Sequence, residues 1–244
     1  MNINPSKCTW HQSPRQSVLI HVASQNKKGC RDFYRTFRAR PNDKSNTSKI
    51  EQKWHQQLGI TLSVTFWDNA WRLHASITEN NQSKWLQCQI LRNSIFTNNR
   101  VSKFRNNVSD QCDLCGLHVE NALTLFNSCD LTRQFWEQMR LFFLTYSHPL
   151  PILKVQILFG VHDEPFDSIS NTAILLGKRV IWASKFRKTA PNIQQFKKSL
   201  KDYLVLLRYC NVIKNTSSIF DDQWGEICRA LAGQDGAELE GGDD

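Results

Sequence analysis

The segment DLTRQFWEQMRLFFLTY, residues 130–146, indicates the fold class of this chain. Its large apolar side chains recur at intervals of three and four residues, as they do on one face of an amphipathic helix. Asp130 stands where a helix N-cap is expected, because its carboxylate can accept hydrogen bonds from the first turn. The segment therefore predicts a helix with one buried face, formed by Leu131, Phe135, Trp136, Met139, Phe142 and Phe143.

Similar periodicity continues on both sides of this segment and predicts a mostly α fold. In the stretch from about Ser83, the spacing places Trp85, Cys88, Leu91 and Ile95 on one face. The apolar run PILKVQILFG at 151–160 is short enough to predict a strand or a buried turn instead of a helix. The expected helices cover roughly residues 49–58, 65–73, 83–95, 130–146, 170–188, 192–212 and 221–233, the last ending at Gly233.

Composition predicts a folded chain with a polyanionic partner. The 244 residues are 40% hydrophobic and 11% aromatic, which argues against wholesale disorder. The formal charge is +9, and because the last ten residues hold five acids and no base, residues 1–234 carry +14. A basic body of this kind favours nucleic acid or an acidic membrane surface as partner.

The chain shows no membrane or secretion signal. No apolar run approaches the roughly 18 residues that span a bilayer, and the N-terminus lacks the order of a secretory signal. We therefore expect an intracellular protein, cytoplasmic or nuclear, with no membrane partner. In a reducing compartment, closely spaced cysteines indicate metal binding more than disulfides.

Charge and periodicity divide the chain into four predicted regions. The first is basic and weakly ordered, the second and third are helical, and the last is an acidic, glycine-rich, disordered tail. A small C-x-x-C knuckle or hairpin at 112–129 interrupts the second region. The boundaries are 1–48, 49–147, 148–233 and 234–244.

The cysteines at 112–129, CDLCGLHVENALTLFNSC, form an incomplete zinc motif. Cys112 and Cys115 have the spacing at which two thiolates on a tight turn reach one metal, and Cys129 supplies a third. A structural zinc site needs four donors. His118 is the histidine nearest to these cysteines, although the first three donors would then share a seven-residue loop.

Four stretches together resemble the reverse transcriptase zinc-binding domain of LINE-type, non-LTR retrotransposon polyproteins and the region that follows it. They are KWHQQLGITLSVTFWDNAW at 53–71, KWLQCQILRNSIFTNNRVSKFRNNVSDQCDLCG at 84–116, LTLFNSCDLTRQFWEQM at 123–139, and the segment 157–200. The resemblance implies a helical zinc-binding module that contacts RNA or DNA with little sequence specificity.

In that family the motif runs C-x-x-C, a spacer with Glu-Thr, then H-L-F-x-x-C and Phe-Trp. The family histidine falls on Thr124, whose neutral hydroxyl is a poor zinc ligand. Three alternatives remain open: His118 completes the site, three thiolates and a water hold zinc more weakly, or the cysteines pack as small apolar residues without metal.

The sequence predicts no catalytic site. The polymerase and endonuclease parts of such polyproteins have no counterpart here, and Asp221-Asp222 is better explained as the acidic start of a helix. No nucleophile elbow, P-loop or dinucleotide-binding glycine pattern occurs. We therefore expect a protein that is not an enzyme.

Basic residues near the knuckle are the predicted nucleic-acid contacts. Their cationic side chains would neutralise phosphates, and Phe96 and Phe104 would stack on bases if exposed, although core packing is the commoner role for either one taken singly. The alternative is an inert remnant or a protein-interaction domain with a protein partner. The predicted contacts are Lys84, Arg92, Arg100, Lys103 and Arg105, with Lys178, Lys185 and Lys188 on one face of a later helix.

Overall fold

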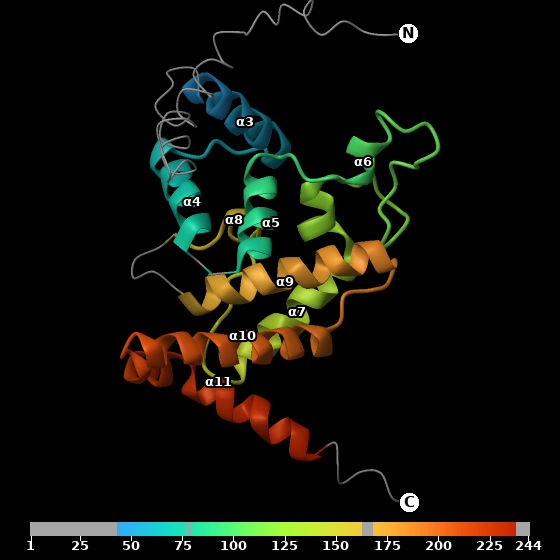
Figure 1. The fold of residues 1–244 in the computed structure, drawn as a ribbon. Helices are drawn as coiled ribbons and strands as arrows, with labels where there is room; N and C mark the ends of the chain where they lie inside the picture. Colours follow the sequence, from blue (N-terminus) through green and yellow to red (C-terminus); the bar gives the residue numbers. More distant parts are fainter. Residues whose placement is uncertain (1–42, 77, 79, 163–167, 238–244) are drawn as a thin grey trace, which may run out of the picture. The chain divides into compact units, whose positions relative to one another are not determined.

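The computed structural model describes residues 43–76, 78, 80–162 and 168–237, and every regular element within them is a helix (Figure 1). The mostly α prediction is therefore confirmed. The chain separates into two compact units, residues 1–53 and 54–244. The helices are α3 (Asp43–Leu58), α4 (Val64–Ser76), α5 (Asn81–Leu91), α6 (Asn98–Val101), the π-helix η2 (Thr124–Ser128), α7 (Asp130–Leu144), α8 (Lys154–Phe159), α9 (Ser168–Arg187), α10 (Ile193–Ile213) and α11 (Ser217–Ala237).

Helix α7 has the buried aromatic face that its spacing predicts. Phe135, Trp136, Met139, Phe142 and Phe143 are all buried. The N-cap position is occupied by Cys129 rather than Asp130, so the third cysteine of the motif lies at the start of this helix. This arrangement fixes the Cys129 sulfur relative to the aromatic core.

Helix α9 is the most deeply buried helix of the second unit. Residues 170–178 are buried around its whole circumference, as expected of a helix enclosed by others. It packs against α5, α10 and η2, and Figure 1 shows it running between α5 and α10. Gly177 allows α9 to approach Trp136 of α7 closely, because a Cβ there would lie 2.7 Å from the Trp136 ring.

Three local predictions were wrong. Residues 154–159 form helix α8 and not a strand, since a short apolar run fits either state until its neighbours are known. Helix α11 continues through Gly233 to Ala237. Trp85 is exposed, whereas Leu86 and Ile90 form the buried face of α5.

Most of both terminal regions lies outside the described residues. The predicted weakly ordered segment 1–48 is described only from Asp43, where α3 begins, and the predicted tail 234–244 only to Ala237. The boundary between 49–147 and 148–233 stays a prediction, and the second unit spans it. None of the described helices is both long enough and apolar enough to cross a bilayer.

Candidate metal centre and the surface beside it

The C-x-x-C segment forms a tight knuckle. The Cys112 N–H donates to the His118 carbonyl oxygen at 2.8 Å, and Gln111 and Val119 form an isolated antiparallel bridge. The turn closes with the Gly116 N–H on the Cys112 carbonyl oxygen at 2.8 Å. Gly116 has a φ of +68°, a conformation that glycine adopts without steric cost. The predicted knuckle or hairpin is confirmed.

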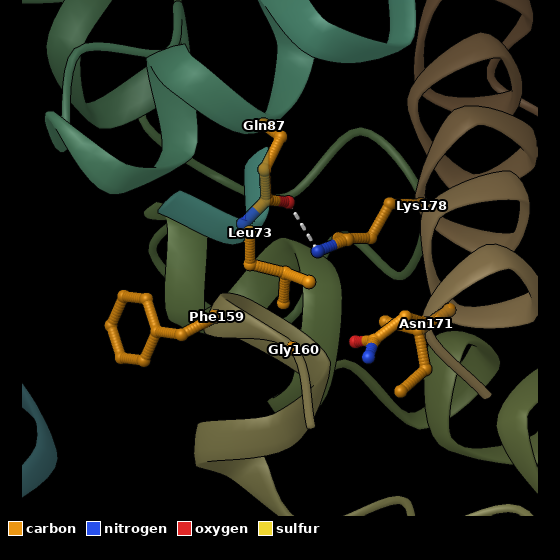
Figure 2. A pocket seen from close by; sticks show the side chains of 7 residues that line it. Leu73, Gln87, Phe159, Gly160, Asn171 and Lys178 are labelled. Carbon is orange, nitrogen blue, oxygen red and sulfur yellow. Dashed lines mark hydrogen bonds between the residues drawn. The ribbon is translucent and has the colours of Figure 1, made fainter. Parts of the chain in front are cut away.

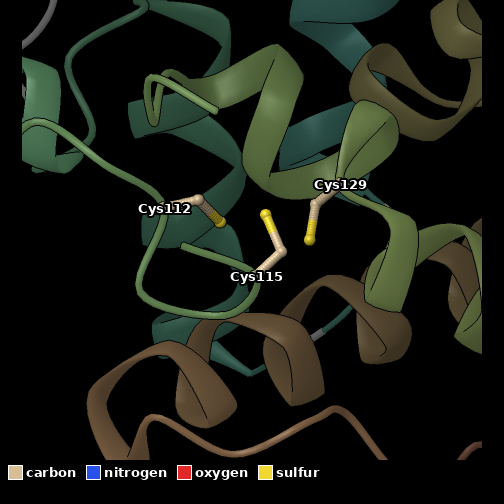
Figure 3. A group of neighbouring side chains, drawn as sticks. All are labelled: Cys112, Cys115 and Cys129. Atoms are coloured by element: carbon tan, nitrogen blue, oxygen red, sulfur yellow. The ribbon is translucent and has the colours of Figure 1, made fainter. Parts of the chain in front are cut away.

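The knuckle and the start of α7 bring three sulfurs together. The Sγ atoms of Cys112, Cys115 and Cys129 all lie within 4.8 Å of one another (Figure 3). Sulfurs around a tetrahedral ion with bonds of about 2.3 Å would lie about 3.8 Å apart, so a small contraction suffices. Cys112 and Cys129 are buried and Cys115 is half-buried. These three cysteines can hold a metal ion.

The electrostatics of the cluster favour a thiolate on Cys129. The hydrogen bond from Cys112 is the main cause that lowers the pKa of Cys129 to about 5, and backbone N–H groups of Thr132 and Leu131 add to it. The same hydrogen bond and burial raise the pKa of Cys112. The thiolate is the form of cysteine that binds metals, so this lowering of the Cys129 pKa favours metal binding.

The structure supplies no fourth protein donor to this cluster among the residues it describes. His118 is exposed, and its ring is not part of the group that the three sulfurs form. Its contribution to the knuckle is the carbonyl oxygen that binds the Cys112 N–H. Thr124 is buried at the start of η2, and its carbonyl oxygen accepts the Cys129 N–H at 2.8 Å. The site therefore has three sulfur donors.

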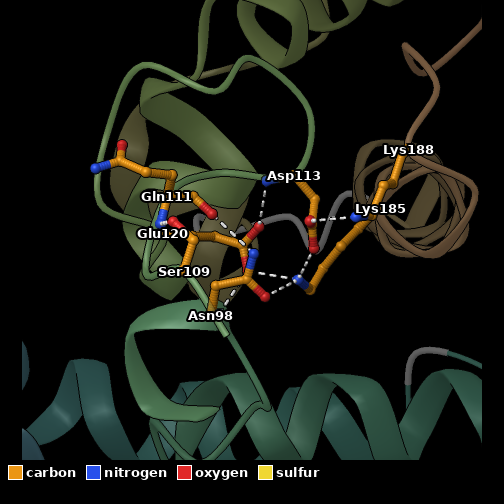
Figure 4. Close-up of polar contacts among 7 residues, drawn as sticks. All are labelled: Asn98, Ser109, Gln111, Asp113, Glu120, Lys185 and Lys188. Carbon is orange, nitrogen blue, oxygen red and sulfur yellow. Dashed lines mark hydrogen bonds and ion pairs between the residues drawn. The ribbon is translucent and has the colours of Figure 1, made fainter. Parts of the chain in front are cut away.

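A buried ionic cluster joins the knuckle to α9 (Figure 4). Lys185 Nζ lies 2.6 Å from Asp113 Oδ2 and 2.7 Å from Glu120 Oε1. It also donates to Asn98 Oδ1 at 2.8 Å. Burial disfavours the Asp113 carboxylate, but the hydrogen bonds from Lys185 and Asn98 outweigh it and hold its pKa below the usual value.

Glu120 connects the two chain segments of this cluster. Its Oε1 accepts the Asn98 N–H at 2.8 Å, at the start of α6, and its Oε2 accepts the Asp113 N–H at 3.1 Å, inside the C-x-x-C turn. Glu120 is fully buried. One carboxylate therefore fixes the backbone of the metal-binding turn and of the segment that precedes it.

Lys185 and Lys178 are not on the surface, which corrects the prediction of a basic helix face. Lys185 is held by the acids described above. Lys178 donates to Gln87 Oε1 and, at 3.3 Å, to the Leu158 carbonyl oxygen (Figure 2). Beside it is a cavity of about 10 Å³ lined in part by Gly160. Of the three predicted lysines only Lys188 is exposed. Because buried amines cannot contact phosphates, Lys188 is the one that remains a candidate contact.

The segment 96–105 carries the exposed part of the predicted surface. Phe96 and Phe104 are 55% and 58% exposed, and the Arg100 guanidinium lies 5.9 Å from the centroid of the Phe96 ring. Lys103 and Arg105 are also exposed. We call Phe96, Arg100, Lys103, Phe104 and Arg105 the 96–105 surface.

Two other predicted cations flank α5. Arg92 is exposed at the C-cap of this helix, and Lys84 is half-buried in its first turn. Neither side chain is fully buried, so both remain predicted nucleic-acid contacts.

Sequence reasoning missed Asp113 and Glu120 as organising residues. Asp113 occupies one of the two variable positions of C-x-x-C, where no charge is required for metal binding. Glu120 stands where the resembled motif has the Glu of its Glu-Thr pair, and this position was the one sequence signal that could have pointed to its role. Phe186, exposed beside this cluster, was also missed.

Comparisons with known proteins add no family. Neither a scan against protein-family models nor a search of curated proteins finds a match for this chain. The resemblance to LINE-type polyproteins therefore rests on the residues quoted for it.

Proposed function

We propose that this chain is a non-catalytic nucleic-acid-binding module, derived from a LINE-type reverse transcriptase polyprotein, whose zinc-bound knuckle supports a basic and aromatic surface. The observation that carries the proposal is the 96–105 surface, where two exposed phenylalanines alternate with three exposed cations. Cations neutralise phosphates without reading sequence, and aromatic faces accept any unpaired base. The expected ligand is RNA or DNA bound with little sequence preference.

The knuckle would serve as the rigid support of this surface. Glu120 links the Asn98 backbone to the Asp113 backbone, so the 96–105 surface and the metal-binding turn share one anchor. A zinc ion on Cys112, Cys115 and Cys129 would stabilise the turn as a structural cross-link. A small exogenous donor such as water would complete its coordination. In this proposal the metal has a structural role only.

A second candidate function is supported by the exposed face of α10. Val205, Leu206, Tyr209, Val212 and Ile213 are all more than half exposed. Apolar side chains at this spacing suit a protein partner. This observation favours the alternative of a protein-interaction domain, and the two functions can coexist on opposite parts of the second unit.

The proposal can be tested by fluorescence anisotropy with a labelled oligonucleotide over a series of salt concentrations. Phosphate-dominated binding should weaken by orders of magnitude between about 50 and about 200 mM salt. Lys103→Ala should reduce the slope of log affinity against log salt by about 1. Lys198→Ala, which removes an exposed lysine of α10, is the matched control and should leave the slope unchanged.

Affinity that does not change with salt, or an equal effect of the two substitutions, would contradict the assigned surface. Zinc is tested separately by native mass spectrometry. One zinc per wild-type chain, lost in Cys112→Ser, is the expected result. A metal-free chain that still binds the oligonucleotide would remove zinc from the proposal and leave the surface in place.

A further inference from the structure

The C-terminal end of α9 presents an aromatic pair that the fold does not use in its core. The rings of Trp182 and Phe186 meet edge to face with centroids 4.8 Å apart. Phe186 is 67% exposed, whereas Trp182 is half-buried and supports it. An exposed phenylalanine held in place by a second ring is a preorganised stacking surface.

Two exposed cations follow this pair in the sequence. Arg187 and Lys188 follow directly and are both exposed. The acids on the facing knuckle, Asp113 and Glu120, are already bound to Lys185, and Asp113 is 3.7 Å from Lys188. We call Trp182, Phe186, Arg187 and Lys188 the α9 platform. Its charge complements a phosphate backbone, and its ring complements a base.

The buried ionic cluster links the end of α9 that carries the α9 platform to the start of α6, which lies within segment 96–105. Lys185, the neighbour of Phe186, contacts Asn98 at the start of α6 and Asp113 in the knuckle. Figure 4 shows these groups meeting at one junction, with Lys188 on the same end of α9. The two chain segments that carry these surfaces are therefore linked through one buried polar cluster.

We propose that a single strand of nucleic acid extends across the knuckle from the 96–105 surface to the α9 platform and stacks an unpaired base on Phe186. The inference rests on the proposed function and narrows its ligand class to single strands. A duplex keeps its bases stacked on one another, so it has no free face for Phe186. A strand must reach both surfaces to use this contact, so the contribution of Phe186 depends on strand length.

The test compares labelled oligothymidylates of about 4 and about 16 nucleotides, the limits of common single-strand site sizes. Phe186→Ala should weaken binding of the long strand by roughly 5-fold or more, the effect of losing one stacked base, and leave the short strand unchanged. Phe104→Ala should weaken both strands. Tyr209→Ala is the matched control, because Tyr209 is a 66% exposed aromatic residue of α10, and it should change neither.

Wild-type affinity of Phe186→Ala for the long strand, with Phe104→Ala weakened, would overturn the inference and leave the proposed function standing. Equal weakening of both strands by Phe186→Ala would also overturn it, because Phe186 would then belong to the primary surface. If the wild-type chain binds neither strand, the proposed function fails and the inference fails with it. Because Phe186 is exposed, a thermal unfolding midpoint equal to that of the wild type should accompany each comparison.

Discussion

Lys178 and Lys185 are two buried amines on the same helix, in opposite electrostatic surroundings. Lys185 is paired with two carboxylates, Asp113 and Glu120. Among the residues that the structure describes, the partners of Lys178 are neutral: the Gln87 side chain and the Leu158 carbonyl oxygen. Burial lowers the pKa of Lys178 to about 7. The helix therefore buries one amine as part of an ion cluster and the other with a weakened hold on its proton.

The difference separates a structural region from a candidate functional one. Around Lys178, Gln87 also donates to the Leu158 carbonyl oxygen at 2.9 Å, so the amine completes a polar link between α5, α8 and α9. Around Lys185, the link runs to the C-x-x-C turn and to α6. Only the second region connects to exposed groups that can bind a ligand.

The largest expected effect is the loss of Lys185. Lys185→Met would leave the fully buried Glu120 without its cation and leave Asp113 with only the exposed Lys188, 3.7 Å away. Removing one partner of a buried ion pair costs about 3–5 kcal/mol in the free energy of unfolding. Urea denaturation at neutral pH measures this loss.

A matched double variant sharpens this result. Lys185→Met/Glu120→Gln removes the uncompensated charge of Glu120 and should recover part of the lost stability. A loss below about 1 kcal/mol for Lys185→Met alone would show that the cluster contributes no more than a surface ion pair does. The ionic partners of Lys185 would then give it no clear stability advantage over the neutral partners of Lys178.

A second effect, of a few kcal/mol, is expected in the pH dependence of stability at Lys178. The folded chain loses the Lys178 proton near pH 7, whereas the unfolded chain keeps it to about pH 10.4. Between these values the unfolded state binds more protons, so this group makes stability rise with pH. Below about pH 7 both states are protonated and the contribution is constant. Lys178→Met should remove this rise.

The measurement is the free energy of unfolding of wild type and Lys178→Met from about pH 6 to 10. The difference between the two isolates this one group from cysteines that titrate in the same range. Lys188→Met is the control and should run parallel to the wild type, because its amine is exposed. Parallel curves for Lys178→Met as well would mean that the Lys178 amine stays protonated inside the fold.

The contrast between the two lysines also explains what the sequence could predict. Helical spacing correctly predicted α7, α9 and α10, because that pattern is local. The three-cysteine cluster could also be predicted from the sequence. Cys112 and Cys115 share one turn, and Cys129 lies at the start of α7. Spacing placed Lys178 and Lys185 on one face of α9 but could not show that other helices cover it.

The partners of these lysines are distant in sequence. Asp113 is 72 residues from Lys185, and Gln87 is 91 residues from Lys178. Lysine side chains are usually exposed, so we expected both amines to lie in solvent. For Phe96 and Phe104 the general expectation was wrong in the opposite direction. Large aromatic residues are usually buried, and these two are exposed. Local patterns indicate which elements form, whereas tertiary packing decides which faces remain in solvent.

The smallest effect on stability is expected at Lys188, the exposed member of the predicted trio. Its side chain is 75% exposed and its Nζ lies 3.7 Å from Asp113, so Lys188→Ala should change the free energy of unfolding by less than about 0.5 kcal/mol. The same substitution should reduce the salt slope of oligonucleotide binding by about 1, because one phosphate contact is lost. An unchanged slope would remove Lys188 from the α9 platform. Of these three amines, only that of Lys188 is exposed, so we expect it to contribute least to stability and most to ligand binding.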